Sequence, residues 1–151
     1  MVDTTLCYIE KEEKYLMLYR NKKKNDVNAG KYVGIGGHVE EGETPEACVI
    51  REAREETGLE IHTPKYRGIV YFISNIYEAE AMHLFTCTDF SGKLIECNEG
   101  ELEWIEKSRL NEIPMWEGDI IFLDLLTKRD DFFTLTLEYE GDKLVKATLD
   151  E

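Results

Sequence analysis

The sequence predicts one mixed α/β domain spanning residues 1–151, with β-hairpins rather than regular strand–helix–strand units. Three observations lead to this prediction. The 151 residues are enough for one hydrophobic core and too few for two typical domains. The hydrophobic content of 42% is that of an ordinary globular protein. Most apolar runs are rich in β-branched and aromatic residues, and only two segments have helical spacing.

The predicted strands follow from their composition and from the turns between them. Residues 4–10 and 14–20 flank the polar stretch "KEE" and predict a hairpin. After a polar loop, "YVGI" is extended before a glycine-rich segment. Two long strands, a turn-rich acidic loop, a short strand and a closing hairpin that turns at "EGD" are predicted at 64–75, 79–90, 91–101, 102–106 and 132–151.

The clearer of the two predicted helices covers residues 45–57. Thr44 is a suitable N-cap, Pro45 stands at the first helical position, and Gly58 suits a left-handed C-cap. The helix face expected to pack on the sheet carries Val49, Ile50, Ala53 and Thr57. The second predicted helix covers residues 117–129.

Three glutamates form an acidic ridge beside that apolar face, because residues three and four apart are neighbours on a helix. They are Glu52, Glu55 and Glu56, and we expect Glu55 and Glu56 to be exposed rather than part of the core. Salt bridges with arginines of the same segment would explain an ordinary acidic helix. Here Glu52 and Glu56 repel each other with no lysine between them, and Glu43 is close enough to join or brace the cluster. Because Mg²⁺ and Mn²⁺ prefer carboxylate oxygens, a bound cation would turn this repulsion into binding.

The composition excludes several classes of function. With 18 basic and 32 acidic residues, the net charge of −14 disfavours duplex nucleic acid and anionic membranes as partners. A small phosphorylated ligand still fits if divalent cations bridge the two negative partners. No apolar run reaches the roughly 18–20 residues of a membrane span, and charges interrupt the N-terminal segment, so we expect a cytoplasmic protein. Four cysteines without a CxxC pair predict free, partly buried thiols.

The segment from Gly37 to Leu59 resembles the Nudix box. It carries Gly37, five residues, Glu43, seven residues, "REA", one residue, "EE", one residue and "GL". Ala53 stands where a bulkier aliphatic residue is usual. The resemblance implies a mixed sheet sandwiched between helices, with the box as a loop–helix–loop. It also implies divalent-metal-dependent hydrolysis of a nucleoside diphosphate linked to another moiety.

The resemblance implies roles for the box residues as well. Mg²⁺, or Mn²⁺, would be held by Glu52, Glu55, Glu56 and the carbonyl of Gly37. Arg51 would orient the carboxylates by pairing with Glu43. The general base can be a box glutamate or one from a distant loop in this family. Glu52 is the first choice here, Glu99 the second and Glu96 the third, and an exposed surface charge is the alternative for both loop glutamates.

Similarity to MutT-type enzymes, which clear oxidised purine nucleoside triphosphates, extends beyond the box. A Met-Trp-Pro-Asp-Asp stretch that lines the base pocket of mammalian-type members corresponds to residues 115–119 here. Trp116 would stack on a purine, unless it is a core aromatic before the helix, and Asp119 would accept hydrogen bonds from the base. Gly118 replaces the first family aspartate, and Val33 replaces an asparagine that reads the base.

The phosphates would meet basic side chains near the glycine loop. The candidates are Arg20, Lys22, Lys23, Lys24 and, next to Gly37, His38. A solvated loop is the alternative for the lysines.

The resulting hypothesis is a Mg²⁺-dependent Nudix pyrophosphohydrolase that cleaves an oxidised purine nucleoside triphosphate, such as 8-oxo-dGTP, to the monophosphate and pyrophosphate. The enzyme alternative acts on ADP-ribose, sugar nucleotides or dinucleoside polyphosphates. A non-catalytic nucleotide-binding module is the third reading. The partner is a small nucleotide in each case, and the protein is a monomer or a homodimer.

Overall fold

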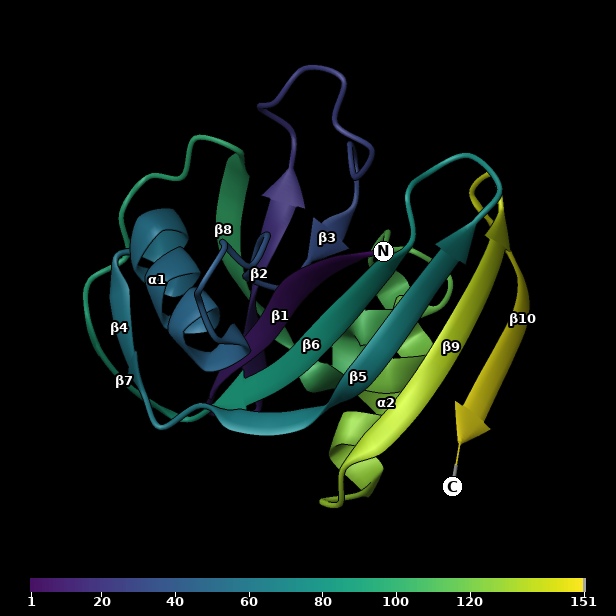
Figure 1. Cartoon of the computed structure of the whole chain (residues 1–151). Coiled ribbons are helices and arrows are strands. Elements are labelled where there is room, and N and C mark those ends of the chain that lie inside the picture. The colour runs from purple at the N-terminus through teal and green to yellow at the C-terminus, as the bar shows by residue number, and fades with distance from the viewer. Residues whose placement is uncertain (151) are drawn as a thin grey trace.

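The computed structural model describes residues 1–150 and shows a mixed sheet with a helix on either face (Figure 1). The main sheet has the strand order β10-β9-β5-β6-β1-β2-β3, and β8 also pairs with β2. Its strands are β1 (Val2–Lys11), β2 (Lys14–Arg20), β3 (Tyr32–Val33), β5 (Lys65–Ser74), β6 (Glu80–Cys87), β8 (Gly100–Glu106), β9 (Phe133–Glu140) and β10 (Lys143–Asp150). The pairs β1–β6 and β5–β9 are parallel and the others antiparallel, which confirms the predicted mixed sheet between helices.

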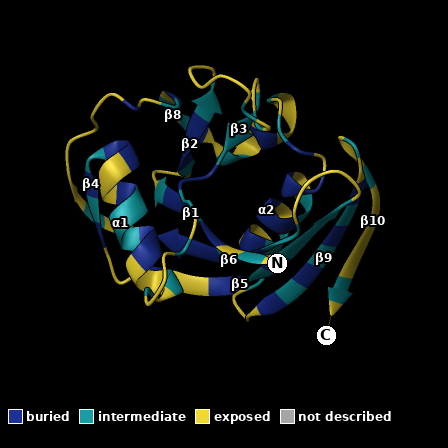
Figure 2. Cartoon of the chain, turned by 45° about the horizontal axis from the view of Figure 1, so that its top comes forward, coloured by how far each residue is buried: buried dark blue, intermediate teal, exposed yellow. Residues whose placement is uncertain are grey.

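Two hydrophobic cores lie on opposite faces of this sheet, because side chains alternate along each strand. On one face, Phe122 of α2 (Asp119–Lys128) belongs to the same core as Val70 and Leu135 of the sheet. On the other face, α1 (Pro45–Thr57) contributes Val49 and Ala53 to the second core. Figure 2 shows that α1 is buried on its sheet-facing side and exposed on its outer side.

Helix α1 begins and ends where its capping residues predict. The Thr44 hydroxyl accepts a hydrogen bond from the Ala47 N–H at 3.1 Å. Gly58 has a φ of 82°, and its N–H donates to the Arg54 carbonyl at 3.0 Å. The predicted sheet-facing residues are buried except for Ile50, which is half-buried.

Both predicted hairpins are present. Glu12 and Glu13 connect β1 to β2 with φ values of 51° and 61°, as in the tight turns that suit a twisted hairpin. Gly141, with a φ of 59°, lies in the turn between β9 and β10. The predicted second helix is α2, and a 3₁₀ helix, η1 (Lys107–Glu112), precedes it.

The region between α1 and β8 differs from the prediction. The strand expected over 79–90 ends at Cys87, and the loop expected over 91–101 contributes residues to two strands. A second, two-stranded sheet forms from β4 (Leu59–His62) and β7 (Asp89–Gly92). Each of these strands has four residues and pairs only with the other, and a strand this short has too little alternation to be predicted from its own sequence.

The remaining predictions on composition concern cysteines and membranes. All four cysteines are free, as predicted, and they are fully rather than partly buried. Among residues 1–150, no helix has the length and apolar character needed to cross a membrane.

Candidate active site

Arg51 lies at the centre of the glutamate-rich segment. It donates to both carboxylate oxygens of Glu43 at 2.8 and 3.0 Å. One of its Nη atoms also donates to Glu52 at 2.9 Å and to Glu55 at 3.1 Å. A further hydrogen bond of 3.2 Å reaches the His38 carbonyl. The predicted pairing of Arg51 with Glu43 is confirmed, and the hydrogen bonds from Arg51 lower the pKa of Glu43 to about 2.

Glu56 is buried, with 6% of its surface exposed, so the prediction that its side chain is exposed is wrong. The physical reason is its position, because it continues the buried helix stripe of Val49 and Ala53 at i+4 and i+3 spacing. Burial, followed by a hydrogen bond with Glu52, raises the pKa of Glu56 to about 9. Its Oε2 atom has no hydrogen-bond partner within residues 1–150. A carboxyl group whose neutral form is favoured by burial, and which has an unused oxygen, therefore lies next to Glu52.

Gly37 leaves room for the carboxyl group of Glu52. A Cβ atom at this position would lie 2.6 Å from the Cδ and Oε1 atoms of Glu52. The Gly37 carbonyl accepts a hydrogen bond from the Thr5 N–H at 2.9 Å, and longer ones from the Thr5 hydroxyl at 3.4 Å and the Cys48 thiol at 3.7 Å. The glycine of the box thus positions the carboxylate rather than only permitting a turn.

The box glutamates do not converge on one point. In the described chain, no group of three or more His, Cys, Asp or Glu side chains is arranged so that it could hold a metal ion. Glu52 and Glu55 both accept from Arg51, while Glu56 is separated from solvent. The acidic donor set and the unpartnered oxygen of Glu56 nevertheless fit a hard divalent cation, which prefers carboxylate oxygens.

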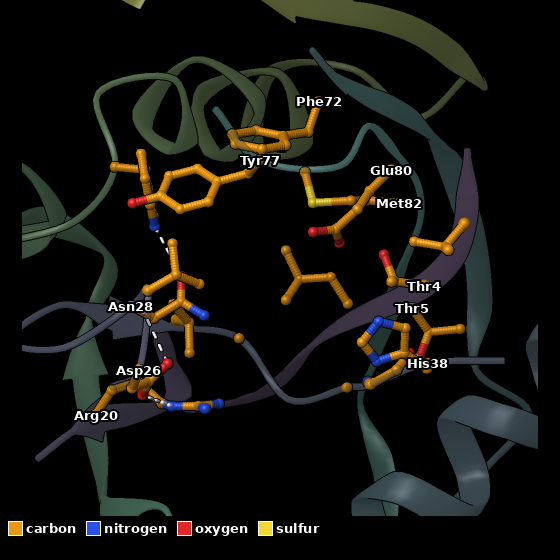
Figure 3. A pocket seen from close by; sticks show the side chains of 18 of the residues that line it. Thr4, Thr5, Arg20, Asp26, Asn28, His38, Phe72, Tyr77, Glu80 and Met82 are labelled. Atoms are coloured by element: carbon orange, nitrogen blue, oxygen red, sulfur yellow. Dashed lines mark hydrogen bonds and ion pairs between the residues drawn. The ribbon is translucent and has the colours of Figure 1, made fainter. Parts of the chain in front are cut away.

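A cavity of about 580 Å³ connects the box to the start of α2 (Figure 3). The predicted site residues that line it are Arg20, Lys23, Gly37, His38, Glu52, Glu99, Trp116 and Asp119. The predicted residues that do not line it are Lys22, Lys24, Glu43, Arg51, Glu55, Glu56 and Glu96. One cavity is thus lined both by residues of the box and by the predicted base-binding residues Trp116 and Asp119.

The basic residues of the cavity are paired with acids. Arg20 lies 2.7 Å from Asp26 and 3.6 Å from Glu99. Lys23 lies 3.7 Å from Glu99. A nucleotide phosphate that used these cations would therefore compete with Glu99.

Lys22 and Glu96 lie outside the cavity. Lys22 donates to the Cys97 carbonyl at 3.2 Å and lies 3.6 Å from Glu96, whose side chain is 90% exposed. The Lys22 N–H donates to the Glu99 carbonyl at 3.4 Å, so Lys22 lies beside a cavity residue although it does not line the cavity itself.

Trp116 is mostly buried, with 7% of its surface exposed, and it belongs to the core under α2. Its indole N–H donates to Asn28 at 2.8 Å, and the Lys31 ammonium lies 4.7 Å from the ring centroid. Tyr139 and Phe72 meet the ring edge-on, with centroids 5.2 and 5.8 Å away. The indole is a fixed cavity wall as well as a core side chain.

Asp119 is the first residue of α2 and is 8% exposed. Burial raises its pKa to about 8, and the charge of Lys31 opposes this shift only in part. The group is therefore predominantly neutral at pH 7 and can donate as well as accept a hydrogen bond.

Gly118 has no space for the carboxylate that the resembling family carries there. A Cβ atom would lie 2.5 Å from a Leu137 methyl and 2.8 Å from the Tyr139 hydroxyl. The Gly118 N–H donates to that hydroxyl at 2.7 Å. Leu137 and Tyr139 fill the place of the missing acid.

Several cavity residues were not predicted from the sequence. They are Asp26, Asn28, Phe72, Tyr77, Glu80 and Tyr139, among others. The polarity of residues 21–30 was the only local signal, and it indicated a loop without singling out Asp26 or Asn28. The others come from strands and connections distant in sequence.

Comparisons with known proteins cover this whole region. A family model described as NUDIX domain matches residues 2–126. An uncharacterized Nudix hydrolase of Bacillus subtilis (strain 168), YvcI, is 32% identical over 145 residues, which are 90% of this chain and 88% of that protein. An oxidized purine nucleoside triphosphate hydrolase of Danio rerio is 33% identical over 132 residues, 85% of this chain and 83% of that protein. Among solved structures, a MutT protein from Bacillus halodurans has a TM-score of 0.89 at 28% identity, covering 99% of this chain and 98% of that one.

Proposed function

Because the chain belongs to the Nudix hydrolase family, we propose that it hydrolyses an oxidised purine nucleoside triphosphate, such as 8-oxo-dGTP, to the monophosphate and pyrophosphate. One observation carries the proposal. A single cavity joins Gly37 and Glu52 of the box to Trp116 and Asp119. Its box end offers acids and paired cations for phosphates, and its other end offers aromatic walls for a base.

A divalent cation, Mg²⁺ or Mn²⁺, is part of this proposal. Glu52, Glu55 and Glu56 would hold it, together with the Gly37 carbonyl. The fit rests on the unpartnered Oε2 of Glu56 among other acids. When bound there, a divalent cation supplies charge neutralisation for phosphate and greater acidity for water.

Glu52 is the proposed general base. It lines the cavity, Arg51 donates a hydrogen bond to its carboxylate, and the absence of a side chain at Gly37 leaves room for that carboxylate. Its task would be to take a proton from the water that attacks phosphorus in line. Glu99 is the second candidate because it lines the same cavity, whereas Glu96 lies outside it.

Arg20, Lys23 and His38 are the proposed phosphate contacts, since all three line the cavity. Trp116 would present one wall to the purine. Asp119, neutral at pH 7, would donate one hydrogen bond to the base edge and accept another.

A second candidate is a different Nudix substrate: ADP-ribose, a sugar nucleotide or a dinucleoside polyphosphate. Gly118 favours it, because Leu137 and Tyr139 occupy the space of a second base-reading acid. Val33 likewise lines the cavity without a polar group. The non-catalytic module is disfavoured because the chain keeps every glutamate of the box.

A substrate screen tests the proposal. Phosphate release would be measured with Mg²⁺ and added pyrophosphatase for 8-oxo-dGTP and the normal dNTPs. For ADP-ribose, sugar nucleotides and Ap₄A it would be measured with added alkaline phosphatase, because their products carry terminal phosphates rather than pyrophosphate. Glu56→Gln is the control that removes a proposed metal ligand while keeping its shape. Preference for 8-oxo-dGTP that is lost in the variant supports the proposal. Preference for another compound reassigns the substrate, and no turnover with any of them refutes hydrolysis of these classes.

A further inference from the structure

Glu80 is a carboxylate in the cavity wall that the proposed chemistry does not use. It begins β6 and lies opposite Val2 of β1 and Phe72 of β5. Directly opposite residues on neighbouring strands point to the same face of a sheet, so the carboxylate stands between two apolar side chains. Glu80 is half-buried, and Figure 3 shows its oxygens directed into the cavity beside Met82.

No positive charge pairs with this carboxylate. Within residues 1–150, no hydrogen bond or ion pair joins the Glu80 side chain to another residue. The lysine and arginine that line the cavity, Lys23 and Arg20, are paired with Glu99 and Asp26. A partly buried carboxylate without a partner is unfavourable in the free protein, and hydrogen-bond donors of a ligand can satisfy it.

The neighbours of Glu80 place it at the aromatic end of the cavity. Phe72 lies opposite it and contacts Trp116 with ring centroids 5.8 Å apart. The Tyr77 ring lies 6.5 Å from the same indole. Flat aromatic walls of this kind suit a nucleobase. Two further acids also line the cavity: Glu78, next to Tyr77 in the sequence, and Asp119, which is 8% exposed.

We propose that Glu80 selects a purine whose edge carries two adjacent N–H donors, as guanine and its oxidised forms do. The inference rests on the proposed function, because it assigns a residue to the base end of the same cavity. A carboxylate has only acceptors, and its two oxygens can accept two parallel N–H groups. Guanine offers its N1–H and 2-amino groups side by side. Hypoxanthine lacks the amino group, and adenine presents an acceptor at N1 that would face the carboxylate.

Paired nucleotides that differ in one group test the inference. dGTP and dITP differ only in the 2-amino group, and their Mg²⁺-dependent hydrolysis would be compared in the wild type and in Glu80→Gln. Because charge-assisted hydrogen bonds are the stronger ones, we expect wild-type kcat/KM to favour dGTP by about 10- to 100-fold. In Glu80→Gln the ratio should approach 1 through a higher KM for dGTP, with kcat changed less than about twofold.

The matched control is Glu138→Gln. Glu138 is another half-buried strand glutamate, and it does not line the cavity. Glu138→Gln should keep the wild-type ratio of kcat/KM for dGTP to that for dITP. Since Glu80 has no partner to lose, Glu80→Gln should not lower the thermal midpoint, which separates a change in selectivity from misfolding.

Binding of dGMP and dIMP, measured by calorimetry, separates failure of this inference from failure of the proposed function. A dGMP preference that disappears in Glu80→Gln supports the inference even if no triphosphate is hydrolysed. Hydrolysis with an unchanged dGTP-to-dITP ratio in Glu80→Gln overturns the inference and leaves the proposed function standing. A change only in the discrimination between GTP and dGTP would assign Glu80 to the sugar and overturn it as well. If neither hydrolysis nor binding is observed, both the inference and the proposed function are refuted.

Discussion

Replacing Glu56 with glutamine should stabilise the metal-free protein at neutral pH. In the folded protein the pKa of Glu56 is about 9, whereas the unfolded chain has the ordinary value near 4.5. Keeping the carboxyl neutral at pH 7 therefore costs about 1.4 kcal/mol for each of roughly 2.5 pH units, or about 3 kcal/mol. Glutamine keeps the shape and a hydrogen bond to Glu52 and carries no such cost.

The sign of the pH dependence follows from proton binding. Between pH 4.5 and about 9 the folded state holds a proton at Glu56 that the unfolded state has lost. The contribution of this group to wild-type stability is thus complete below pH 4.5, falls as the pH rises, and is lost once the pH passes the folded pKa. Glu56→Gln should lack this slope.

Denaturant unfolding in EDTA at several pH values measures this difference, with Glu138→Gln as the control on β9. We expect Glu56→Gln to exceed the wild type by about 3 kcal/mol at pH 7 and by less than about 0.5 kcal/mol at pH 4.5. Adding Mg²⁺ at pH 7 should stabilise the wild type with release of a proton, and should stabilise the variant less. Identical pH slopes in wild type and variant would show that Glu56 is ionised in the folded protein and refute the reasoning.

Three further variants follow from the site geometry. Gly37→Ala should lower kcat by about 100-fold with a small change in stability, because its Cβ would displace the Glu52 carboxyl; kinetics and thermal melts check this. Trp116→Ala should cost about 3–5 kcal/mol of folding free energy because the indole is buried in the core. Trp116→Phe is therefore the better probe of base contact, and its KM for purine nucleotides would be compared with its KM for pyrimidine nucleotides. Lys23→Gln should raise KM by about 10-fold, whereas Lys22→Gln should not, because only Lys23 lines the cavity; equal effects would contradict the placement.

Local signals account for the parts of the fold that could be predicted. Thr44, Pro45 and Gly58 mark the ends of α1 because caps and turns depend on neighbouring residues alone. The two hairpins likewise follow from alternation and from short polar turns. Strands β4 and β7 could not be predicted in this way, since their pairing joins residues about 30 positions apart.

For the site, too, features set by nearby residues could be predicted and features set by distant packing could not. The resemblance to the Nudix box implied that Arg51 and Glu43 pair, and they do. The burial of Glu56 depends on what packs over α1, and the spacing alone placed it on an exposed ridge. Glu80 and Tyr77 reach the cavity through the pairing of distant strands and their connection, so nothing near them in the sequence points to a ligand.

Product analysis tests the central claim most directly. The wild type and Glu52→Gln would be incubated with 8-oxo-dGTP in Mg²⁺ and in EDTA, and all phosphorylated products separated and quantified. The account predicts equal amounts of 8-oxo-dGMP and pyrophosphate from the wild type in Mg²⁺. It predicts almost none in EDTA and a loss of about 1,000-fold in Glu52→Gln. Release of 8-oxo-dGDP and phosphate, turnover in EDTA, or undiminished activity of Glu52→Gln would contradict it.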